Sequence, residues 1–452
     1  MNRAYCLFSM AVACVSSCLQ PAWGETLDQA WERALAANEG LRAAEKQVDS
    51  ARHGLKSAKA ARFPVFQLSG GYVALDKEPT IDIEEGLGMS FPESSRLNIT
   101  NPVTGAAFDL SQFSNFELGQ DTLGTAQFSA ALPLYAGGQI SGLIKVADAG
   151  LEGLQWQRDR VEKELKLTVG QAYVNVLRAQ QAVNISEDEL RTLRAHVQDV
   201  ENLFDQGLVA RNDLLAVRVA ELESQQRSIM INNMLELARS FYNRLMDRPM
   251  DAPVNLDELI VPGAPLALEY YAEKAKTQRP ELKALDAQVR ALKSTAKVVL
   301  AGMMPQVGLV GGYMYLEMDA LQDKSFGYGG VAMSWNLFDF GATRNQADSV
   351  VATAESYWEQ FQEADEMIGL QVRQVWLSYK ESLSRVDVTK QALASADENL
   401  EVARDRYRHG FGTNTEVLDA EVRRTAAYAN NNNAVYDAVY NRLRLLQVTG
   451  EI

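Results

Sequence analysis

The sequence repeats itself once, and this repeat constrains the fold more than any other feature. Residues 37–51 (ANEGLRAAEKQVDSA) align without gaps on residues 278–292 (QRPELKALDAQVRAL), at an offset of 241. From about residue 126 onward the offset is 203, so the first copy holds 38 additional residues before that point. Self-similarity over such lengths indicates one structural unit that is built twice.

Both copies show the same order of patterns, with a period of 2 for strands and about 3.6 for helices. We expect two repeats, 25–247 and 266–450, joined by a linker at 248–265 that contains four prolines. The first repeat is expected to hold strands at about 64–76 and 124–136, a long helix at about 139–205 and a return helix at about 212–247. The second is expected to hold strands at about 305–317 and 327–338, a long helix at about 341–408 and a return helix at about 415–449.

The expected strands alternate in phase across the two copies. One face of the first strand carries Phe66, Leu68 and Tyr72, and the matching face of its repeat carries Leu309 and Tyr313. Each strand has about 10 residues, which is the length that a tilted strand needs to cross a bilayer. A hairpin with one face on a soluble core would show the same alternation. Four strands leave open edges, so membrane strands of this number would need more than one chain.

The long helices favour strands that cross a membrane over a hairpin that packs on a soluble core. Residues 139–205 contain no proline, and as one helix they would span ~100 Å. A 3–4 spaced apolar seam typical of coiled coils runs along each helix. Its members are Leu190, Leu193, Val197, Val200 and Phe204 in the first copy, and Leu393, Ala396, Leu400, Ala403 and Tyr407 in the second. Gly207 and Gly410 follow as left-handed helix ends.

The first residues indicate export. A short basic start, an apolar run and the small residues of AWG predict a signal peptide over residues 1–24. All three cysteines, Cys6, Cys14 and Cys18, lie inside it, so the mature chain would have no disulfide or thiolate site. An alternative is a lipoprotein box in which Cys18 becomes acylated. The net charge of −15 argues against nucleic acid as a partner.

Each strand–helix transition carries a recognisable junction. In the first copy it is LPLYAGGQ, in which we single out Pro133, Tyr135, Gly137 and Gly138. In the second copy it is WNLFDFGA, with Phe338 and Gly341. We expect the proline to end sheet pairing, the aromatic residues to sit near the membrane interface, and the glycines to let the backbone turn into the helix.

With these junctions and the segments GLVARNDLLA (207–216) and YRHGFGTNTEVLDA (407–420), the chain resembles the TolC family of outer-membrane efflux proteins over nearly its whole mature length. The resemblance implies a mixed α and β fold in a homotrimer. A 12-stranded outer-membrane β-barrel would continue as a long periplasmic α-helical coiled-coil barrel. It implies a passive exit duct of a tripartite efflux or type I secretion system, which exports drugs, ions or proteins. Its partners would be outer-membrane lipid, a periplasmic adaptor and an inner-membrane pump.

The resemblance also suggests site residues at the periplasmic tip. Glu416 and Asp419 match two acids of the family and are gate candidates, with Asp213 at the equivalent place in the first copy. The alternative is that these acids favour the start of a helix. Some family members carry a latch arginine where this chain has Gly412, so Arg211 or Arg408 would have to replace it. The turn residues are candidates for adaptor docking: Gly207, Leu208, Val209, Gly410, Phe411 and Gly412.

Enzymatic chemistry is not expected. The sequence contains no nucleophile, phosphate-loop or metal-protease motif, and we expect no cofactor or metal. We expect His53, His196 and His409 to be isolated surface residues. The remaining alternative to a duct is a periplasmic coiled-coil structural spacer without a pore, which would not require four phase-matched strands of membrane length.

Overall fold

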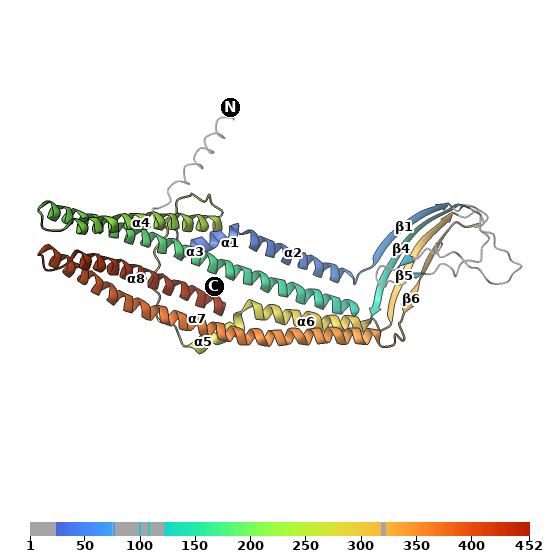
Figure 1. Ribbon diagram of the computed structural model, residues 1–452. Helices are drawn as coiled ribbons and strands as arrows, with labels where there is room; N and C mark the ends of the chain where they lie inside the picture. The colour runs from blue at the N-terminus through green and yellow to red at the C-terminus, as the bar shows by residue number, and fades with distance from the viewer. Residues whose placement is uncertain (1–23, 75, 77–98, 101–106, 109–121, 318–321) are drawn as a thin grey trace, which may run out of the picture. The chain divides into compact units, whose positions relative to one another are not determined.

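The computed structural model describes residues 24–74, 76, 99–100, 107–108, 122–317 and 322–452, so the expected signal peptide and most of the expected loop at 76–125 lie outside the described residues. Figure 1 shows the elements. They are α1 (Leu27–Ala37), α2 (Glu39–Ala60), β1 (Val65–Ala74), β2 (Ile99–Thr100), β3 (Ala107–Phe108), β4 (Thr122–Ala136), α3 (Gln139–Asp205), α4 (Arg211–Leu245), α5 (Leu268–Gln278), α6 (Pro280–Ala301), β5 (Gln306–Glu317), β6 (Ser325–Ser334), α7 (Ala342–Arg408) and α8 (Asn414–Thr449).

The chain forms two compact units. One contains the chain up to Glu45 with residues 157–282 and 363–452, and the other contains residues 46–156 and 283–362. We call them the helical unit and the sheet unit. Four helices, α2, α3, α6 and α7, contribute to both.

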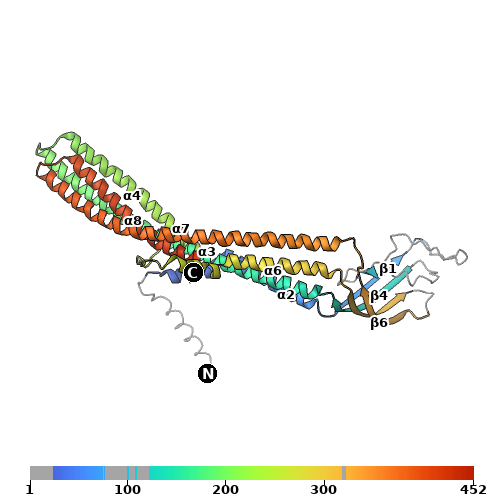
Figure 2. The ribbon, with the colours of Figure 1, turned by 90° about the horizontal axis from the view of Figure 1, so that it is seen from below.

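The sheet unit holds an antiparallel sheet in the order β1-β4-β5-β6, visible in Figures 1 and 2. Val65 lies opposite Ala131 in the β1–β4 pair, and Gln306 lies opposite Ser334 in the β5–β6 pair. These pairs are equivalent under the two offsets of the repeat, so the hydrogen-bond register repeats as well as the sequence. The β4–β5 pair joins the two repeats, which leaves β1 and β6 as the edges.

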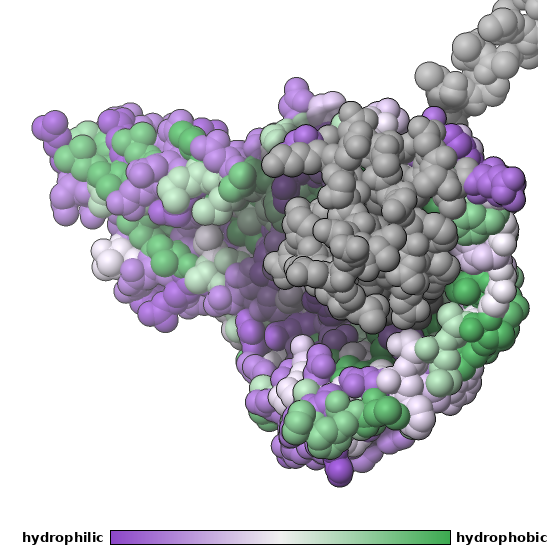
Figure 3. Space-filling model, turned by 90° about the vertical axis from the view of Figure 1, so that its right-hand side faces the viewer, coloured by the Kyte–Doolittle hydropathy of each residue, from purple (hydrophilic) through white to green (hydrophobic). Residues whose placement is uncertain are grey.

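One face of this sheet is apolar and exposed in the single chain. Phe66, Phe128 and Tyr313 lie on it, and all three side chains are exposed. Leu68 pairs with Phe128, which pairs with Tyr313, so the predicted apolar faces of neighbouring strands coincide. Figure 3 looks at the sheet end and shows apolar surface in green along its lower and right-hand margin. The other face mixes polar and apolar residues: Met314 and Phe326 lie on it, and Gln127 Nε2 donates there to the Tyr328 hydroxyl at 2.7 Å.

The two strand–helix junctions differ in the structure although their sequences are alike. β4 continues through Pro133 to Ala136, and the ladder with β5 shifts between Pro133 and Tyr135, so the proline marks a bulge and not the expected end of pairing. β6 ends at Ser334, four residues short of the expected 338. The reason is that β5, which is the neighbour of this edge strand in the described part of the sheet, begins at Gln306, which already pairs with Ser334.

The glycines of the junctions lie where the backbone is left-handed. Gly137 has φ of +58°, Gly138 of +90° and Gly341 of +86°. A Cβ on Gly137 would lie 2.4 Å from Cβ of Met304, so this position also needs the space. Phe338 is exposed and stacks edge-on against Phe340, with ring centroids 4.6 Å apart.

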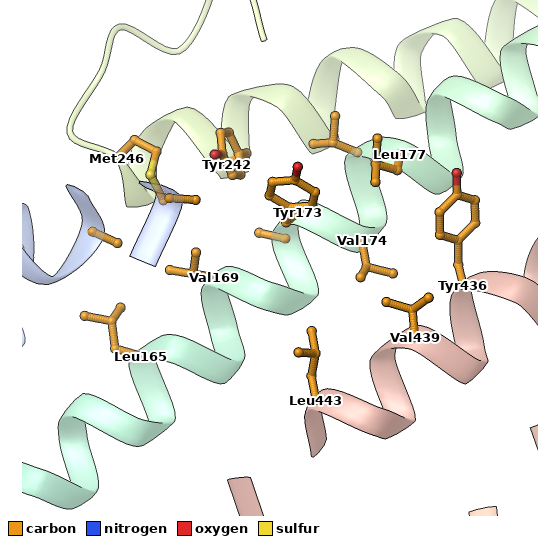
Figure 4. Close-up of a cluster of buried hydrophobic side chains, with 14 of the residues drawn as sticks. Leu165, Val169, Tyr173, Val174, Leu177, Tyr242, Met246, Tyr436, Val439 and Leu443 are labelled. Atoms are coloured by element: carbon orange, nitrogen blue, oxygen red, sulfur yellow. The ribbon is translucent and has the colours of Figure 1, made fainter. Parts of the chain in front are cut away.

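The core of the helical unit lies where α1, α3, α4 and α8 meet (Figure 4). Tyr173 and Tyr242 are fully buried there and pack edge to face, with ring centroids 6.2 Å apart. The Tyr173 hydroxyl lies 2.7 Å from the carbonyl oxygens of both Glu25 and Asp257. It thereby fixes the start of the described chain to the segment between the repeats, where Glu25 also forms a parallel bridge with Leu256. Among the described residues, no helix is both long and apolar enough to cross a membrane.

Candidate functional site: the helical tip

Two helix–turn–helix corners form the end of the helical unit, and each turns at a glycine. Gly207 has φ of +72° and Gly410 of +77°. The amides of Gly207 and Leu208 donate to the carbonyls of Phe204 and Leu203, and the second corner repeats this pattern one copy later. This is the Schellman arrangement, in which a left-handed residue lets the free carbonyls of the last helical turn accept hydrogen bonds. The structure therefore places both glycines where the sequence pattern had indicated helix ends.

The turn residues differ in exposure. Leu208 is 67% exposed and Phe411 is 78% exposed, so each corner presents one large apolar side chain to solvent. Val209, in contrast, packs on the buried cluster of the tip. Gly412 is confined, because a Cβ there would lie 3.2 Å from Arg406 Cβ, Glu416 Oε2 and the Tyr407 amide nitrogen. A larger residue at this position would require its neighbours to move.

The gate candidates lie just inside the two return helices. Asp213 is in the first turn of α4 and half-buried. Glu416 is in the first turn of α8, where its amide donates to the capping Thr413 hydroxyl at 3.3 Å. The side chains of Glu416 and Asp419 are exposed, three positions apart. Glu416 therefore favours the helix start by its position, and its side chain is exposed to solvent.

The seam predicted from the sequence brings the four helices of the tip together. Val197, Val200, Leu400 and Ala403 are all buried in one cluster with Tyr407. Residues of α4 and α8 complete the cluster: Leu214, Val217, Val417 and Ala420. The tip is thus a four-helix packing arrangement in which both copies of the repeat contribute equivalent residues.

His196 was predicted from the sequence to be a surface residue, and this prediction is wrong. It is only 5% exposed, and its Nε2 lies 2.8 Å from Oδ1 of the buried Asn414. Its ring packs edge-on against Tyr407, with centroids 5.5 Å apart. Burial lowers the pKa of His196, although the Asn414 hydrogen bond opposes this. The spacing in the sequence indicates this burial, because position 196 lies on the same helix face as Leu193 and Val200.

Asn414 connects the two corners. Its Nδ2 donates to the carbonyl of Asp213 at 3.1 Å while its oxygen faces His196. A second link joins the long helices, where Arg408 of α7 pairs with Asp199 of α3 at 2.9 Å. Arg408, one of the two arginines considered as a replacement latch, is therefore engaged within its own chain.

A network of charges crosses the bundle behind the tip. Arg424 of α8 contacts Asp188 of α3 at 2.9 Å and Asp397 of α7 at 2.7 Å. Glu421 lies beside it and is 3% exposed, with Arg404 at 3.4 Å. Burial raises the pKa of Glu421 to about 7, against the opposing effect of Arg404 and Arg424. Within the described residues, no group of three or more metal-binding side chains is placed to hold a metal ion.

A run of four asparagines at 430–433 has no evident role in the sequence. In the structure, two of them connect α8 to α3 and α7. Asn432 is buried and its Nδ2 donates to the Arg178 carbonyl of α3 at 3.1 Å. Asn431 accepts from the Thr389 hydroxyl of α7 at 3.2 Å. Polar contacts of this kind between packed helices fix their register.

This arrangement, with long paired helices, a glycine corner in each repeat and an open sheet, also has counterparts among known proteins. The sequence pattern of the outer membrane efflux protein family matches residues 30–240 and 271–451, which is one match on each repeat. The chain belongs to the outer membrane efflux protein family. The family expected from the junction and tip segments is therefore confirmed, and the chain is an outer-membrane protein.

Individual relatives of this family are distant. The chain is 26% identical over 276 residues to the cation efflux system protein CusC of Escherichia coli, a match that spans 56% of each protein. It is 22% identical to the outer membrane protein TolC of Escherichia coli, over 95% of this chain and 83% of TolC. The solved structure of the outer membrane protein VceC from Vibrio cholerae superimposes with a TM-score of 0.76 at 17% identity, over 94% of this chain and 96% of VceC.

Proposed function

We propose that three copies of this chain form a passive export duct, with a 12-stranded barrel in the outer membrane continued by a helical barrel in the periplasm. The observation that carries the proposal is the sheet, which has an exposed apolar face and two open edges. Lipid solvates the apolar face but leaves unpaired edge groups unsatisfied, so the edges must close on other copies. Three copies of four strands give the twelve strands that such a barrel needs.

The helices support assembly independently of the sheet. α4 carries exposed apolar side chains at spacings of mostly 3, 4 and 7, with one adjacent pair, which is the pattern of a helix that packs on a partner. They are Leu215, Val219, Leu222, Ile229, Met230, Met234, Leu237 and Phe241. A single chain leaves this stripe in water, whereas a ring of copies would bury it. A monomeric spacer without a pore would have no use for the stripe or for the apolar sheet face.

At the tip, we propose that Glu416 and Asp419, with Asp213, line the entrance of the duct. Three copies would place six carboxylates of the first two residues around it and favour cations. The exposed Leu208 and Phe411 offer apolar contacts for a periplasmic adaptor, which in turn would recruit an inner-membrane pump. The pump and adaptor would supply energy and choose the cargo among drugs, ions or proteins, so the duct itself performs no enzymatic step.

The first experiment measures assembly and conduction. We expect the protein extracted from outer membranes in detergent to have three times the mass of one chain by light scattering. In planar bilayers it should form ion-conducting channels. Recovery of the protein as a monomer from the soluble periplasm would contradict the proposal.

A second experiment tests docking at the tip. Leu208→Asp combined with Phe411→Asp should reduce the amount of adaptor that is recovered by crosslinking at the tip, because charge disfavours an apolar contact. The trimer mass should be unchanged. The matched control is Leu222→Asp, which alters an exposed leucine of α4 away from the turns and should weaken the trimer instead.

A further inference from the structure

The two helices that lead into the sheet, α2 and α6, end in segments rich in basic residues. The chain has 59 acidic and 44 basic residues, yet positions 52–64 and 293–305 contain no acid. Their lysines and arginines are Arg52, Lys56, Lys59, Arg62, Lys293 and Lys297. The other two helices of the sheet unit lack this excess, because α3 and α7 carry the exposed acids Asp148 and Asp348 within their first ten residues. The positive charge is therefore concentrated where α2 and α6 meet the sheet.

The basic positions recur in both copies of the repeat. At the offset of 241, Arg52 matches Lys293 and Lys56 matches Lys297. The spacing of four places the two members of each pair on one face of their helix. All four lysines of these segments are exposed, and within the described residues none of them forms an ion pair, whereas Arg52 is engaged by Asp49 at 2.6 Å. The lysines therefore do not hold the single chain together.

The second copy shows that this face stays open when helices pack on both sides. Figures 1 and 2 show α6 between α3 and α7 within the sheet unit. On the α3 side the packing is close, since a Cβ on Gly142 would lie 2.6 Å from Cγ2 of Val298. Lys293 and Lys297 are exposed although α6 is flanked in this way. The face that carries them is therefore a surface of the wall and not a contact between neighbouring helices.

The basic face of α6 leads to the apolar face of the sheet. Leu300, three residues after Lys297, is exposed, and so is Met303 in the turn that follows. Trp335 lies two residues after the exposed Met333 of β6, and its Nε1 donates to the Met303 carbonyl at 3.0 Å. The lysines of α6 therefore lie just beyond the margin of the sheet face that the proposed duct places in lipid.

The lysines lie within reach of a headgroup layer at this margin. Because α6 ends at Ala301, Lys297 and Lys293 lie ~6 and ~12 Å from its end along the helix axis. The headgroup region on each side of a bilayer is about 5–8 Å deep. A lysine can extend its flexible stem so that the ammonium reaches this layer. Each such cation raises the affinity for an anionic lipid surface about fivefold.

We propose that Lys56, Lys59, Lys293 and Lys297 form a basic collar that binds the phosphate groups of anionic phospholipids in the membrane leaflet next to the helices. This inference rests on the proposed duct and adds a lipid preference that conduction does not require. Three copies of four lysines give a collar of twelve. The net charge of −15 would otherwise repel an anionic surface, so the collar supplies attraction where the chain meets it.

Tryptophan fluorescence tests the collar directly. The assembled protein is reconstituted in vesicles of phosphatidylcholine that contain either brominated phosphatidylglycerol or brominated phosphatidylcholine, because bromine quenches a neighbouring indole. Trp335 lies at the margin of the sheet and reports the lipids beside α6, and Trp335→Phe gives the background from the other tryptophans. At low salt we expect phosphatidylglycerol to be preferred at least about fivefold, the effect of one cation. The preference should shrink at high salt, which screens the attraction.

Two substitutions in α6 connect the preference to the collar. Lys293→Gln combined with Lys297→Gln should bring the ratio close to one, whereas Lys293→Arg with Lys297→Arg should retain it. The matched control is Lys390→Gln with Arg423→Gln, which removes two exposed cations of the helical unit and should leave the preference unchanged. None of these variants should alter conductance in planar bilayers.

The outcomes separate this inference from the proposed function. A conducting trimer without the preference, or with a preference that survives the double glutamine variant of α6, would overturn the collar and leave the duct intact. A changed ion selectivity in that variant, with an unchanged lipid preference, would place the lysines inside the duct and also overturn the collar. If neither brominated lipid quenched Trp335, the sheet would not lie in the membrane, and the duct would fail as well.

The salt dependence keeps the test valid if the glutamine variant does not assemble, because it is measured on the unaltered protein. A preference for phosphatidylglycerol that does not change with salt would contradict binding through the exposed lysines.

Discussion

At the scale of single residues, the tip depends on backbone conformation at its turns and on one buried carboxyl behind them. Gly207 and Gly410 occupy left-handed backbone that residues with a Cβ adopt only at a cost. Glu421 is buried among arginines and other acids and holds its proton more strongly than an exposed glutamate. Substitutions at Gly410 and Glu421 should therefore change stability differently from the same substitutions at Gly369 and Glu401.

We expect Gly410→Ala to lower the stability of the helical unit by about 1–2 kcal/mol, because alanine is strained at positive φ. Gly369→Ala, inside α7 and with open space around it, should instead raise stability by about 0.5–1 kcal/mol through helix propensity. Unfolding midpoints followed by far-ultraviolet circular dichroism would measure both. Similar effects of the two substitutions would argue against a left-handed turn at Gly410.

The raised pKa of Glu421 predicts a pH dependence with a definite sign. The folded pKa of about 7 exceeds the ordinary value of 4.5, so the unfolded chain releases this proton first as pH rises. Stability should therefore fall between about pH 4.5 and 7, by an amount on the order of 3 kcal/mol, and stay constant above that window.

Glu421→Gln should remove this dependence, so the variant is more stable than the unaltered protein at pH 8 and similar to it at pH 4.5. Thermal unfolding across this range measures the difference. Glu401→Gln, which changes an exposed acid of α7, is the control and should run parallel to the unaltered protein. A Glu421→Gln curve that also runs parallel would refute the assignment.

At the scale of helices and strands, contacts between elements decide register and length. Asn432 links α8 to α3 through the Arg178 carbonyl. We expect Asn432→Ala to destabilise the helical unit by about 1 kcal/mol, the usual net contribution of one hydrogen bond. Its neighbour Asn433 is exposed, so Asn433→Ala should be neutral or slightly stabilising. Equal losses from both would indicate that helix propensity and not the Arg178 contact determines the effect.

Periodicity predicted those features that depend on residues close in sequence. The bounds expected for the long helix at 139–205 coincide with those of α3, and the apolar faces of the strands agree with the pairing of Phe66, Phe128 and Tyr313 on one side. Contacts between distant residues left little local signal. The end of β6 depends on where β5 begins, and the burial of His196 depends on Asn414, which lies 218 positions away.

At the scale of the whole molecule, the proposed duct makes the tip acids an electrostatic filter. Glu416→Gln with Asp419→Asn should reduce cation selectivity in bilayer conductance, because six carboxylates would leave the entrance of a trimer. Glu223→Gln, an exposed acid of α4 away from the helix starts, provides the control and should conduct as the unaltered protein does. Unchanged selectivity in the double variant would contradict the filter and would indicate that Glu416 and Asp419 only favour the start of the helix.

The contacts around Asp437 have a mechanical consequence. Arg178 of α3 and Arg385 of α7 both bond to this carboxylate of α8, at 2.8 and 3.4 Å, close to the asparagine links. Sliding α8 by one residue, ~1.5 Å, would strain all of these bonds, whereas tilting the helix about them would strain few. We therefore expect α8 to behave as a lever with its fulcrum near Asp437. The arm from there to Asn414 is ~35 Å long, so a tilt of about 10° would carry the helix start through about 6 Å.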